Sequence, residues 1–301
     1  MLNHYNDLFD YEGQKVNFFP SIGLKLTNKC NFNCPFCCEP DKDQKLFPIS
    51  NFNEIIIKIS KYGTKRLCIT GGDPLLYPDI ADLLAYSTSL DFYNLLLTTN
   101  GSLLKQKHKE VSPFINAVRL SIHGMNSKHD DVVGHHGAFD ETANAIDFLT
   151  ANNIPCFVTT VVTPFNVNDI NNIAEWSFSK GVTKYYLFAL MKSGKGKIFI
   201  ELNGEVSPEQ INNIYAELKN KYSSNNMDII YYDYINNAEC ILIYGDGKIV
   251  IDPYPKSTTF QLEIGNIFTD TQEEIIERFL KDKDNLNGHR IHLNKHNKKF
   301  T

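Results

Sequence analysis

Four cysteines crowd into the stretch Lys25-Leu-Thr-Asn-Lys-Cys30-Asn-Phe-Asn-Cys34-Pro-Phe-Cys37-Cys38, which continues a short apolar run. Three of them, Cys30, Cys34 and Cys37, are spaced so that their thiolates can converge on one iron–sulfur cubane. Three protein ligands leave one iron of such a cluster open, and a substrate or cofactor can chelate that iron. The spacing therefore predicts a [4Fe–4S] cluster with chemistry at its open iron.

Other interpretations of the cysteines fit less well. A structural zinc site normally has four ligands, often in two separated pairs. Cys38 is available as a fourth ligand, but adjacent residues rarely bind one ion, and no second pair follows. A thioredoxin-like redox pair would use Cys34 and Cys37 and leave Cys30 unexplained. Ordinary buried cysteines are common singly and improbable at this density.

Short runs rich in branched and aromatic residues alternate with amphipathic runs from residue 22 to residue 190. The predicted strands are Ile22–Thr27, Lys65–Thr70, Tyr93–Thr99, Ala117–His123, Cys156–Val162 and Lys184–Leu190. The predicted helices between them are Asn51–Tyr62, Asp79–Ser87, Asp140–Ala151 and Asp169–Ser179. This alternation implies parallel pairing through right-handed crossovers. We therefore expect an α/β fold, a partial (β/α)6 TIM-like barrel.

The unusual residues of this chain all follow the predicted strands. They are the cysteines, Gly71-Gly72-Asp73, Asn100-Gly101, His123-Gly124, Pro164–Asn166 and Lys192–Gly196. Active sites of β/α barrels lie where strands end and loops begin. These loops are therefore expected to form one site.

The Cys-x-x-x-Cys-x-x-Cys pattern after a first strand resembles that of the radical S-adenosylmethionine (radical SAM) superfamily, and the match extends over most of residues 20–196. The resemblance implies one [4Fe–4S] cluster, held by Cys30, Cys34 and Cys37, whose open iron binds the amino and carboxylate groups of S-adenosylmethionine. It also implies reductive cleavage of that cofactor to a 5′-deoxyadenosyl radical, which abstracts hydrogen from a substrate. An electron donor such as flavodoxin or ferredoxin is the implied partner.

The same resemblance implies the cofactor contacts. Gly71, Gly72 and Asp73 resemble a Gly-Gly-Glu-Pro motif that receives the methionine ammonium, with aspartate here in place of glutamate. The further expected contacts, with the cofactor's sugar, carboxylate or adenine, are Phe36, Thr99, Asn100, Ser121, Asn166 and Leu187. Capping the next helix is an alternative role for Asn166. His123 is expected either to touch the substrate or to cap its strand.

Beyond Gly196 the pattern changes. A helix at Pro208–Tyr222 and a run at Asp228–Tyr232 precede the predicted hairpin Ile241–Tyr244 / Lys248–Ile251, which turns at an Asp-Gly pair. A last helix is predicted at Thr271–Lys281. This part resembles a shortened SPASM or twitch extension, in which cysteines beside the hairpin bind auxiliary clusters. Only Cys240 remains here, so we expect a single cluster per chain.

The expected organisation is a lead-in at 1–19, a core barrel at 20–200, the extension at 201–282 and a polar basic tail at 283–301. Cys240 is either a hydrogen donor that quenches a substrate radical or a small packing residue. Without an auxiliary cluster, epimerisation, rearrangement, elimination or decarboxylation becomes more plausible. The short lead-in favours a small polar metabolite or natural-product intermediate as substrate. A ribosomally made peptide is the alternative, and a non-enzymatic iron–sulfur or zinc protein is a remote one.

The bulk composition excludes other classes. The chain has 301 residues, of which 42% are hydrophobic and 22% charged, as in ordinary proteins with a real core. A formal net charge of −5 provides no basic field for nucleic acid. The N-terminus has neither a secretory signal nor a membrane span, and the cysteines do not suggest a disulfide framework. We therefore expect a cytoplasmic enzyme without nucleic-acid or membrane partners.

Overall fold

The computed structural model describes residues 9–11, 14–16, 18–39, 46–90, 92–232, 240–254 and 261–283. Ten strands form one sheet in the order β12-β11-β10-β3-β4-β5-β6-β7-β8-β9. Their bounds are β3 Ser21–Lys25, β4 Arg66–Thr70, β5 Asn94–Thr99, β6 Ala117–Ser121, β7 Cys156–Val161, β8 Lys184–Phe188, β9 Asp228–Tyr232, β10 Cys240–Tyr244, β11 Lys248–Asp252 and β12 Leu262–Asn266. Pairing is parallel from β10 through to β9 and antiparallel for β11 and β12. Two short strands, β1 Phe9–Tyr11 and β2 Gln14–Val16, pair separately.

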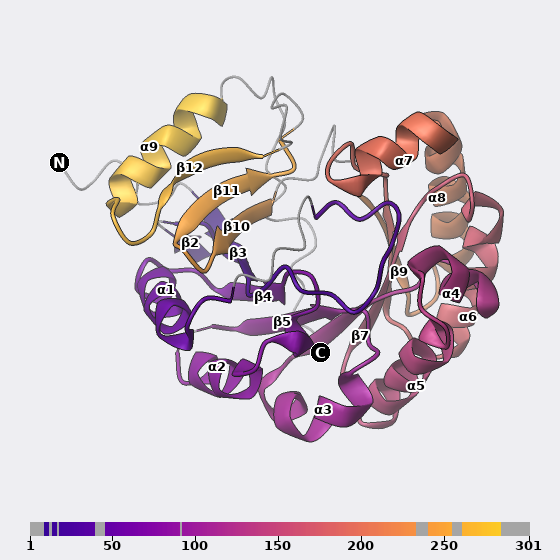
Figure 1. Ribbon diagram of the computed structural model, residues 1–301, viewed down its shortest axis with the longest axis horizontal. Coiled ribbons are helices and arrows are strands. Elements are labelled where there is room, and N and C mark those ends of the chain that lie inside the picture. Colours follow the sequence, from indigo (N-terminus) through magenta and orange to yellow (C-terminus); the bar gives the residue numbers. More distant parts are fainter. Residues whose placement is uncertain are drawn as a thin grey trace.

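The helices lie mainly on the outer side of this curved sheet, as Figure 1 shows, although Phe199 of the helix at Lys195–Asn203 packs against Phe36. They are α1 Ile49–Lys61, α2 Ile80–Thr88, α3 Leu104–Val111, α4 Ser127–Val133, α5 Ala138–Ala151, α6 Ile170–Ser179, α7 Lys195–Asn203, α8 Pro208–Tyr222 and α9 Gln272–Lys283. Three short 3-10 helices lie at Pro74–Leu76, Ser112–Phe114 and Val167–Asp169. The parallel order with helical crossovers confirms the predicted α/β fold, and the sheet is open rather than a closed barrel.

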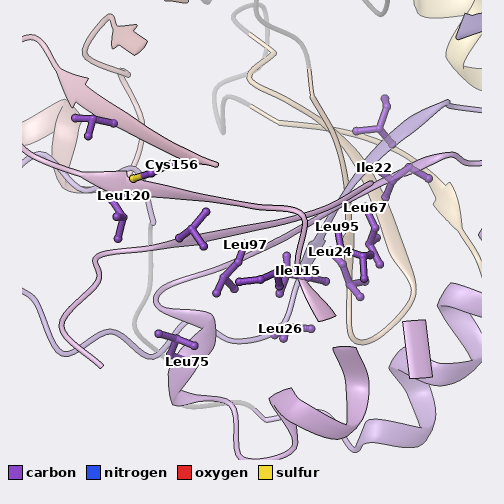
Figure 2. Packing of buried hydrophobic residues seen from close by; sticks show 14 of the residues in the cluster. Ile22, Leu24, Leu26, Leu67, Leu75, Leu95, Leu97, Ile115, Leu120 and Cys156 are labelled. Atoms are coloured by element: carbon purple, nitrogen blue, oxygen red, sulfur yellow. The ribbon is translucent and has the colours of Figure 1, made fainter. Parts of the chain in front are cut away.

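The main core lies between the sheet and the helices. Alternate strand residues point into it, so Leu24, Leu67, Leu97 and Leu120 are fully buried there (Figure 2). The intervening residues lie on the opposite side of the sheet, which we call the inner face. A second cluster covers part of that face: Leu96, Ala117, Phe157, Tyr186 and Ile230, with Cys68, Phe188 and Tyr232 against them. The sheet thus keeps an apolar outer face and a more mixed inner face.

The six predicted core strands are confirmed, each within a few residues of its predicted bounds, and so is the hairpin of β10 and β11. The later strands do not form a sheet of their own. β9 pairs with β8 and β10 pairs with β3, so both join the core sheet at its two edges. Pairing of this kind covers the two edges that the six core strands would otherwise leave exposed, and β12 and β9 become the edges of the sheet. The predicted division at residue 200 stays a prediction, and the predicted tail lies almost entirely outside the described residues.

Candidate active site

The cysteine loop follows β3 and is held from both ends by backbone hydrogen bonds. At its start, the N–H groups of Gly72 and Asp73 donate to the carbonyls of Thr27 and Lys29, both at 2.7 Å. At its end, the N–H of Lys195 donates to the Cys37 carbonyl at 2.9 Å. In its middle, the N–H of Asn33 donates to the carbonyl of Val133 at 2.8 Å. Loops after three different strands therefore fix the path of the cysteines.

Glycines let these loops approach the cysteine loop closely. A Cβ on Gly72 would lie 2.2 Å from the Lys29 carbonyl oxygen, and one on Gly194 would lie 2.7 Å from the Cys38 carbonyl carbon. Gly194 also has φ +54°, a conformation that favours glycine. Gly71 and Gly72 therefore pack against the loop backbone, which explains the need for two glycines there.

The three predicted ligands, Cys30, Cys34 and Cys37, are half-buried, whereas Cys38 is exposed. Cys30 and Cys34 pack against the apolar patch formed by Phe32, Val133 and Ala138. Among the described residues, no three His, Cys, Asp or Glu side chains are placed to hold one metal ion. A cubane binds each cysteine to a different iron, so its thiolates need not meet at one ion. The half-buried thiols beside an apolar patch fit a [4Fe–4S] cluster.

Asn100 links the third strand-end loop to this cysteine loop. Its Nδ2 lies 3.9 Å from the Sγ of Cys30 and donates to the Asn31 Oδ1 at 2.8 Å. Its Oδ1 accepts from the N–H and hydroxyl of Ser102 at 2.9 and 2.7 Å. The amide orientation is thereby fixed, with its N–H side toward the thiol.

Asp73 is fully buried and its carboxylate is engaged within the protein. Oδ1 accepts from the N–H of Leu75 at 2.9 Å, and Oδ2 accepts from the Thr99 hydroxyl at 2.7 Å and the Asn100 N–H at 2.9 Å. Burial raises the pKa of this carboxyl, and these hydrogen bonds oppose the shift. Both carboxylate oxygens of Asp73 are thus hydrogen-bonded within the protein, and its predicted contact with the cofactor ammonium stays a prediction.

His123 is buried and held as a neutral imidazole. Burial, with a smaller contribution from His129, lowers the pKa of His123 to about 3. Its Nδ1 accepts the N–H of Val161 at 3.2 Å, which assigns the ring proton to Nε2. His129 repeats this arrangement, because its Nδ1 accepts the His123 N–H at 2.9 Å and burial lowers its pKa to about 4. Sequence reasoning gave His129 no chemical role, and no spacing motif marks it.

Asn166 is buried, and both N–H groups of its amide are used. Nδ2 donates to the carbonyls of His123 at 3.0 Å and Val161 at 2.9 Å, while Oδ1 accepts from the Thr163 N–H. No side-chain cap forms at the following 3-10 helix. Asn166 therefore ties the ends of β6 and β7 together. The alternative role as a helix cap is wrong, and the predicted contact with the cofactor stays a prediction.

A cavity of about 370 Å³ opens beside the cysteine loop, lined by Pro35, His123, Gly124, Lys128, Asp131, Val132, Phe165 and Asp169. The ring of Phe36 stands edge-on to that of His123, with centroids 5.0 Å apart. Ser121 ends β6 on the inner face and is half-buried, and its predicted contact with the cofactor stays a prediction. Leu187 instead points into the fully buried helix-side core, so only its backbone is available to a cofactor.

Cys240 begins β10 and is exposed on the inner face of the sheet. Desolvation of its sulfur raises the pKa of this thiol to about 11, and Arg119 opposes the shift. Cys240 is therefore a protonated thiol at neutral pH. It shares the inner face with Cys68, whose Sγ lies 3.5 Å from the hydroxyl of Thr98.

Comparison with known proteins matches this arrangement to one family. The profile of the Radical SAM superfamily covers residues 24–177, which is half of the chain. The chain belongs to the radical SAM superfamily. It is accordingly an enzyme whose cofactors are a [4Fe–4S] cluster and S-adenosylmethionine, and the resemblance stated from the cysteine pattern is confirmed. The comparisons do not confirm the SPASM-like character of the C-terminal part.

Curated relatives in this superfamily have different activities. The chain is 28% identical over 174 residues to the sporulation killing factor maturation protein SkfB of Bacillus subtilis, covering 56% of this chain and 42% of that protein. It is 26% identical to GTP 3′,8-cyclase of Clostridium perfringens, covering 63% of this chain and 60% of the cyclase. It is 28% identical to AdoMet-dependent heme synthase of Methanosarcina barkeri, covering 62% and 54%. The chain therefore spans about half the length of these relatives.

Solved structures share the fold at low identity. SuiB of Streptococcus suis bound to S-adenosylmethionine superposes with a TM-score of 0.69 at 14% identity, covering 85% of this chain and 65% of SuiB. Native anSMEcpe with bound AdoMet gives 0.66 at 16% identity, covering 85% and 80%. Within the described ranges, no helix is both long and apolar enough to cross a membrane.

Proposed function

We propose that this radical SAM enzyme abstracts a hydrogen atom from a small polar metabolite or natural-product intermediate and returns one, without net oxidation of the substrate. When bound, the cluster and S-adenosylmethionine supply a 5′-deoxyadenosyl radical by one-electron reductive cleavage of a sulfonium carbon–sulfur bond. The observation that carries the proposal is a fixed cysteine loop at the carboxyl edge of a sheet whose inner face holds a protonated thiol, Cys240.

In this proposal Cys30, Cys34 and Cys37 each hold one iron. The backbone of Gly71, Gly72 and Asp73 receives the methionine part of the cofactor. The further cofactor contacts are Phe36, Asn100, Ser121 and the backbone at Leu187, and Thr99 and Asn166 hold the loops that carry them. The neutral His123 points a fixed Nε2–H donor from the wall of the cavity toward cofactor or substrate.

In this proposal Cys240 returns a hydrogen atom to the substrate radical. The substrate radical takes the hydrogen atom of the Cys240 S–H bond, which leaves a thiyl radical. One electron and one proton restore the thiol, and a flavodoxin or ferredoxin is the proposed source of that electron. Each turnover would therefore consume two electrons, one in the chemistry that the cofactor supplies and one in reducing the Cys240 thiyl radical. Epimerisation, with hydrogen returned from the side opposite its removal, fits a donor placed at the far end of the strands from the cysteine loop.

The test is anaerobic reconstitution, followed by S-adenosylmethionine and dithionite and detection of 5′-deoxyadenosine by mass spectrometry. We expect product from the wild type and from Cys38→Ala, and none from Cys30→Ala, Cys34→Ala or Cys37→Ala. Iron and sulfide are measured on every variant. A wild type with a full, reducible cluster that binds the cofactor but never cleaves it, with or without cell extract as a substrate source, contradicts the proposal.

Peptide modification is the second candidate. Two comparisons favour it, since SkfB is a maturation protein of a sporulation killing factor and SuiB has been solved bound to a precursor peptide. GTP 3′,8-cyclase and AdoMet-dependent heme synthase, by contrast, are named for small molecules. Incubation in deuterated solvent with peptide and metabolite fractions of an extract separates the two, because the class that takes up deuterium contains the substrate.

A further inference from the structure

Arg119 lies in the middle of β6 and faces the inner side of the sheet. Its neighbours Val118 and Leu120 are fully buried in the helix-side core. Because successive strand residues point to opposite faces, the Arg119 side chain projects onto the inner face. It pairs in register with Thr98 of β5 and Phe157 of β7. A guanidinium therefore stands in the centre of the face that carries Cys240.

Aromatic side chains surround this guanidinium. Its carbon lies 5.8 Å from the ring centroid of Tyr186 and 5.8 Å from that of Phe188, both on β8. Tyr232 of β9 stacks on these two rings, at 5.8 Å from Tyr186 and 4.8 Å from Phe188. We call Tyr186, Phe188 and Tyr232 the aromatic wall. Arginine stacks on such rings and still directs its N–H groups outward along its own plane.

No anion neutralises Arg119 within the described part of the chain. No carboxylate oxygen there lies within 4.0 Å of its guanidinium, and the residue makes no hydrogen bond with those residues through its side chain. Lys25, a buried cation on β3, is by contrast paired with Glu39 at 2.5 Å. A half-buried guanidinium without such a partner leaves its hydrogen-bonding capacity for a ligand.

The position of Arg119 along β6 is close to the proposed cofactor edge of the sheet. It lies two residues before Ser121, which ends β6 at the proposed cofactor edge. Two residues of strand span about 7 Å, which places the guanidinium within reach of a metabolite-sized molecule held at that edge. A molecule in this position would also lie near Cys240 and Cys68, whose thiols interact electrostatically with Arg119.

We propose that Arg119 binds the anionic group, a carboxylate or a phosphate, of a small-molecule substrate whose planar or apolar part lies against the aromatic wall. Arginine recognises both anions through paired N–H donors. This inference rests on the proposed function and narrows it to an anionic metabolite. Arg119 is then a substrate-binding residue, and the aromatic wall selects what is attached to the anion.

The test measures binding of small probes to the reconstituted enzyme in the presence of S-adenosylmethionine, without reductant. The probes are benzoate, phenyl phosphate, the neutral isostere benzamide, and the capped acidic peptide acetyl-Ala-Glu-Ala-amide. We expect benzoate or phenyl phosphate to bind at least tenfold more tightly than benzamide, and the better of the two identifies the anion. Arg119→Gln should abolish this preference, and Arg119→Lys should retain part of it. Thermal unfolding and iron content show whether each variant is folded and loaded.

Equal binding of all the small probes, or an unchanged preference in a folded Arg119→Gln, overturns the inference. Tight binding of the acidic peptide alone, dependent on Arg119, overturns the small-molecule part of it. Because binding needs no cofactor cleavage, the outcome is independent of 5′-deoxyadenosine formation. A wild type that binds the anions but makes no 5′-deoxyadenosine contradicts the proposed function and leaves the anion site standing.

Discussion

The contact between Asn100 and Cys30 concerns the electron affinity of the cluster. An N–H directed at a ligating sulfur stabilises negative charge on the cluster, and reduction adds such charge. The amide of Asn100 is held in that orientation by Asn31 and Ser102. A side chain two strands away from the cysteines is thus placed to influence the reduction of a cluster held by Cys30.

Replacing Asn100 with alanine should therefore lower the reduction potential of the reconstituted cluster. If the hydrogen bond favours the reduced cluster by about 1 kcal/mol, the potential falls by about 40 mV for one electron. Redox titration followed by electron paramagnetic resonance measures it. Ser102→Ala is the matched control, because it removes a neighbour of the amide but leaves the N–H donor. An unchanged potential in Asn100→Ala, with full iron content, would contradict the assignment.

The buried side chains of His123 and His129 make the free energy of unfolding depend on pH. Burial lowers the pKa values of His123 and His129 to about 3 and about 4, whereas an unfolded histidine titrates near its usual value of about 6.5. Between these values the unfolded chain binds protons that the folded chain does not, so stability is full above pH 6.5 and falls as the pH drops. His129 faces His123 and Asp130, and the latter opposes its shift.

We expect each histidine to cost about 1.4 kcal/mol per pH unit below pH 6.5, or about 2 kcal/mol at pH 5. His129→Asn retains an acceptor for the His123 N–H but removes one titrating group, so it should lessen the pH dependence by that amount. Urea unfolding of the loaded enzyme at pH 7.5, 6.0 and 5.0 measures the effect. His136→Asn, at an exposed position, is the control. Equal slopes in wild type and His129→Asn would refute the linkage.

At the scale of elements, helix α7 braces the end of the cysteine loop. Gly194 precedes this helix and lies against the Cys37 and Cys38 carbonyls, and the Lys195 N–H donates to Cys37. Gly204 follows the other end of the same helix with φ +77°, and a Cβ there would meet no atom of the described residues within 4 Å. The two glycines share a positive φ and differ only in what lies beside them.

This difference makes a matched pair of substitutions. Gly194→Ala should displace the cysteine loop and reduce bound iron and sulfide by more than half, because a Cβ would lie 2.7 Å from the Cys38 backbone. Gly204→Ala should cost only the local backbone strain of φ +77° with an extended ψ, about 1–3 kcal/mol, with full cluster loading. Iron and sulfide analysis after reconstitution, with thermal unfolding, separates the two effects. Equal iron loss in both variants would mean that backbone strain at a positive φ, rather than contact with the cysteine loop, causes the loss of the cluster.

Elements with a strong pattern were predictable from sequence. The six core strands and the Asp-Gly hairpin were predicted near their observed bounds, because their apolar runs and turn residues act locally. Helices α3, α4 and α7 were not, since Leu104–Val111 and Ser127–Val133 are mostly polar and Lys195–Asn203 begins within a glycine-rich loop. Their positions are set by tertiary contacts, such as Val133 with the cysteine loop, which no local pattern encodes.

The site was predictable in its cysteines and less so in its partners. Spacing alone marks Cys30, Cys34 and Cys37, because ligands of one cluster must be close in the chain here. The hydrogen bond from Thr99 to the Asp73 carboxylate joins residues 26 positions apart, and that from Asn166 to the His123 carbonyl joins residues 43 positions apart. Arg119 carries no motif, and it becomes notable only through the rings of β8 and the missing carboxylate among its described neighbours.

At the scale of the whole molecule, the sheet brings the N-terminal and C-terminal parts of the chain to one face. β10 pairs in parallel with β3, so Cys240 and Tyr244 join the strand that leads into the cysteine loop. Lys25 of β3 pairs with Glu39 beyond the cysteines and stands over the ring of Tyr244 at 4.8 Å. The C-terminal strands therefore share the inner face with the core strands, although the family profile ends at residue 177.

This arrangement couples Arg119 on β6 to Cys240 on β10 across the inner face. The guanidinium charge lowers the pKa of the Cys240 thiol, which desolvation nevertheless holds at about 11.

At pH 9 the thiolate fraction of Cys240 should be about one hundredth, so iodoacetamide should alkylate it far more slowly than a cysteine in an unfolded peptide. Arg119→Gln should slow it further, because the stabilising charge is gone. Peptide mapping of the loaded enzyme gives the rate, with Lys180→Gln, the loss of a distant surface charge, as control. A faster or unchanged alkylation rate in Arg119→Gln would show that the two residues do not interact electrostatically. That result would contradict the proposal that a substrate lies between the Arg119 guanidinium and the Cys240 thiol.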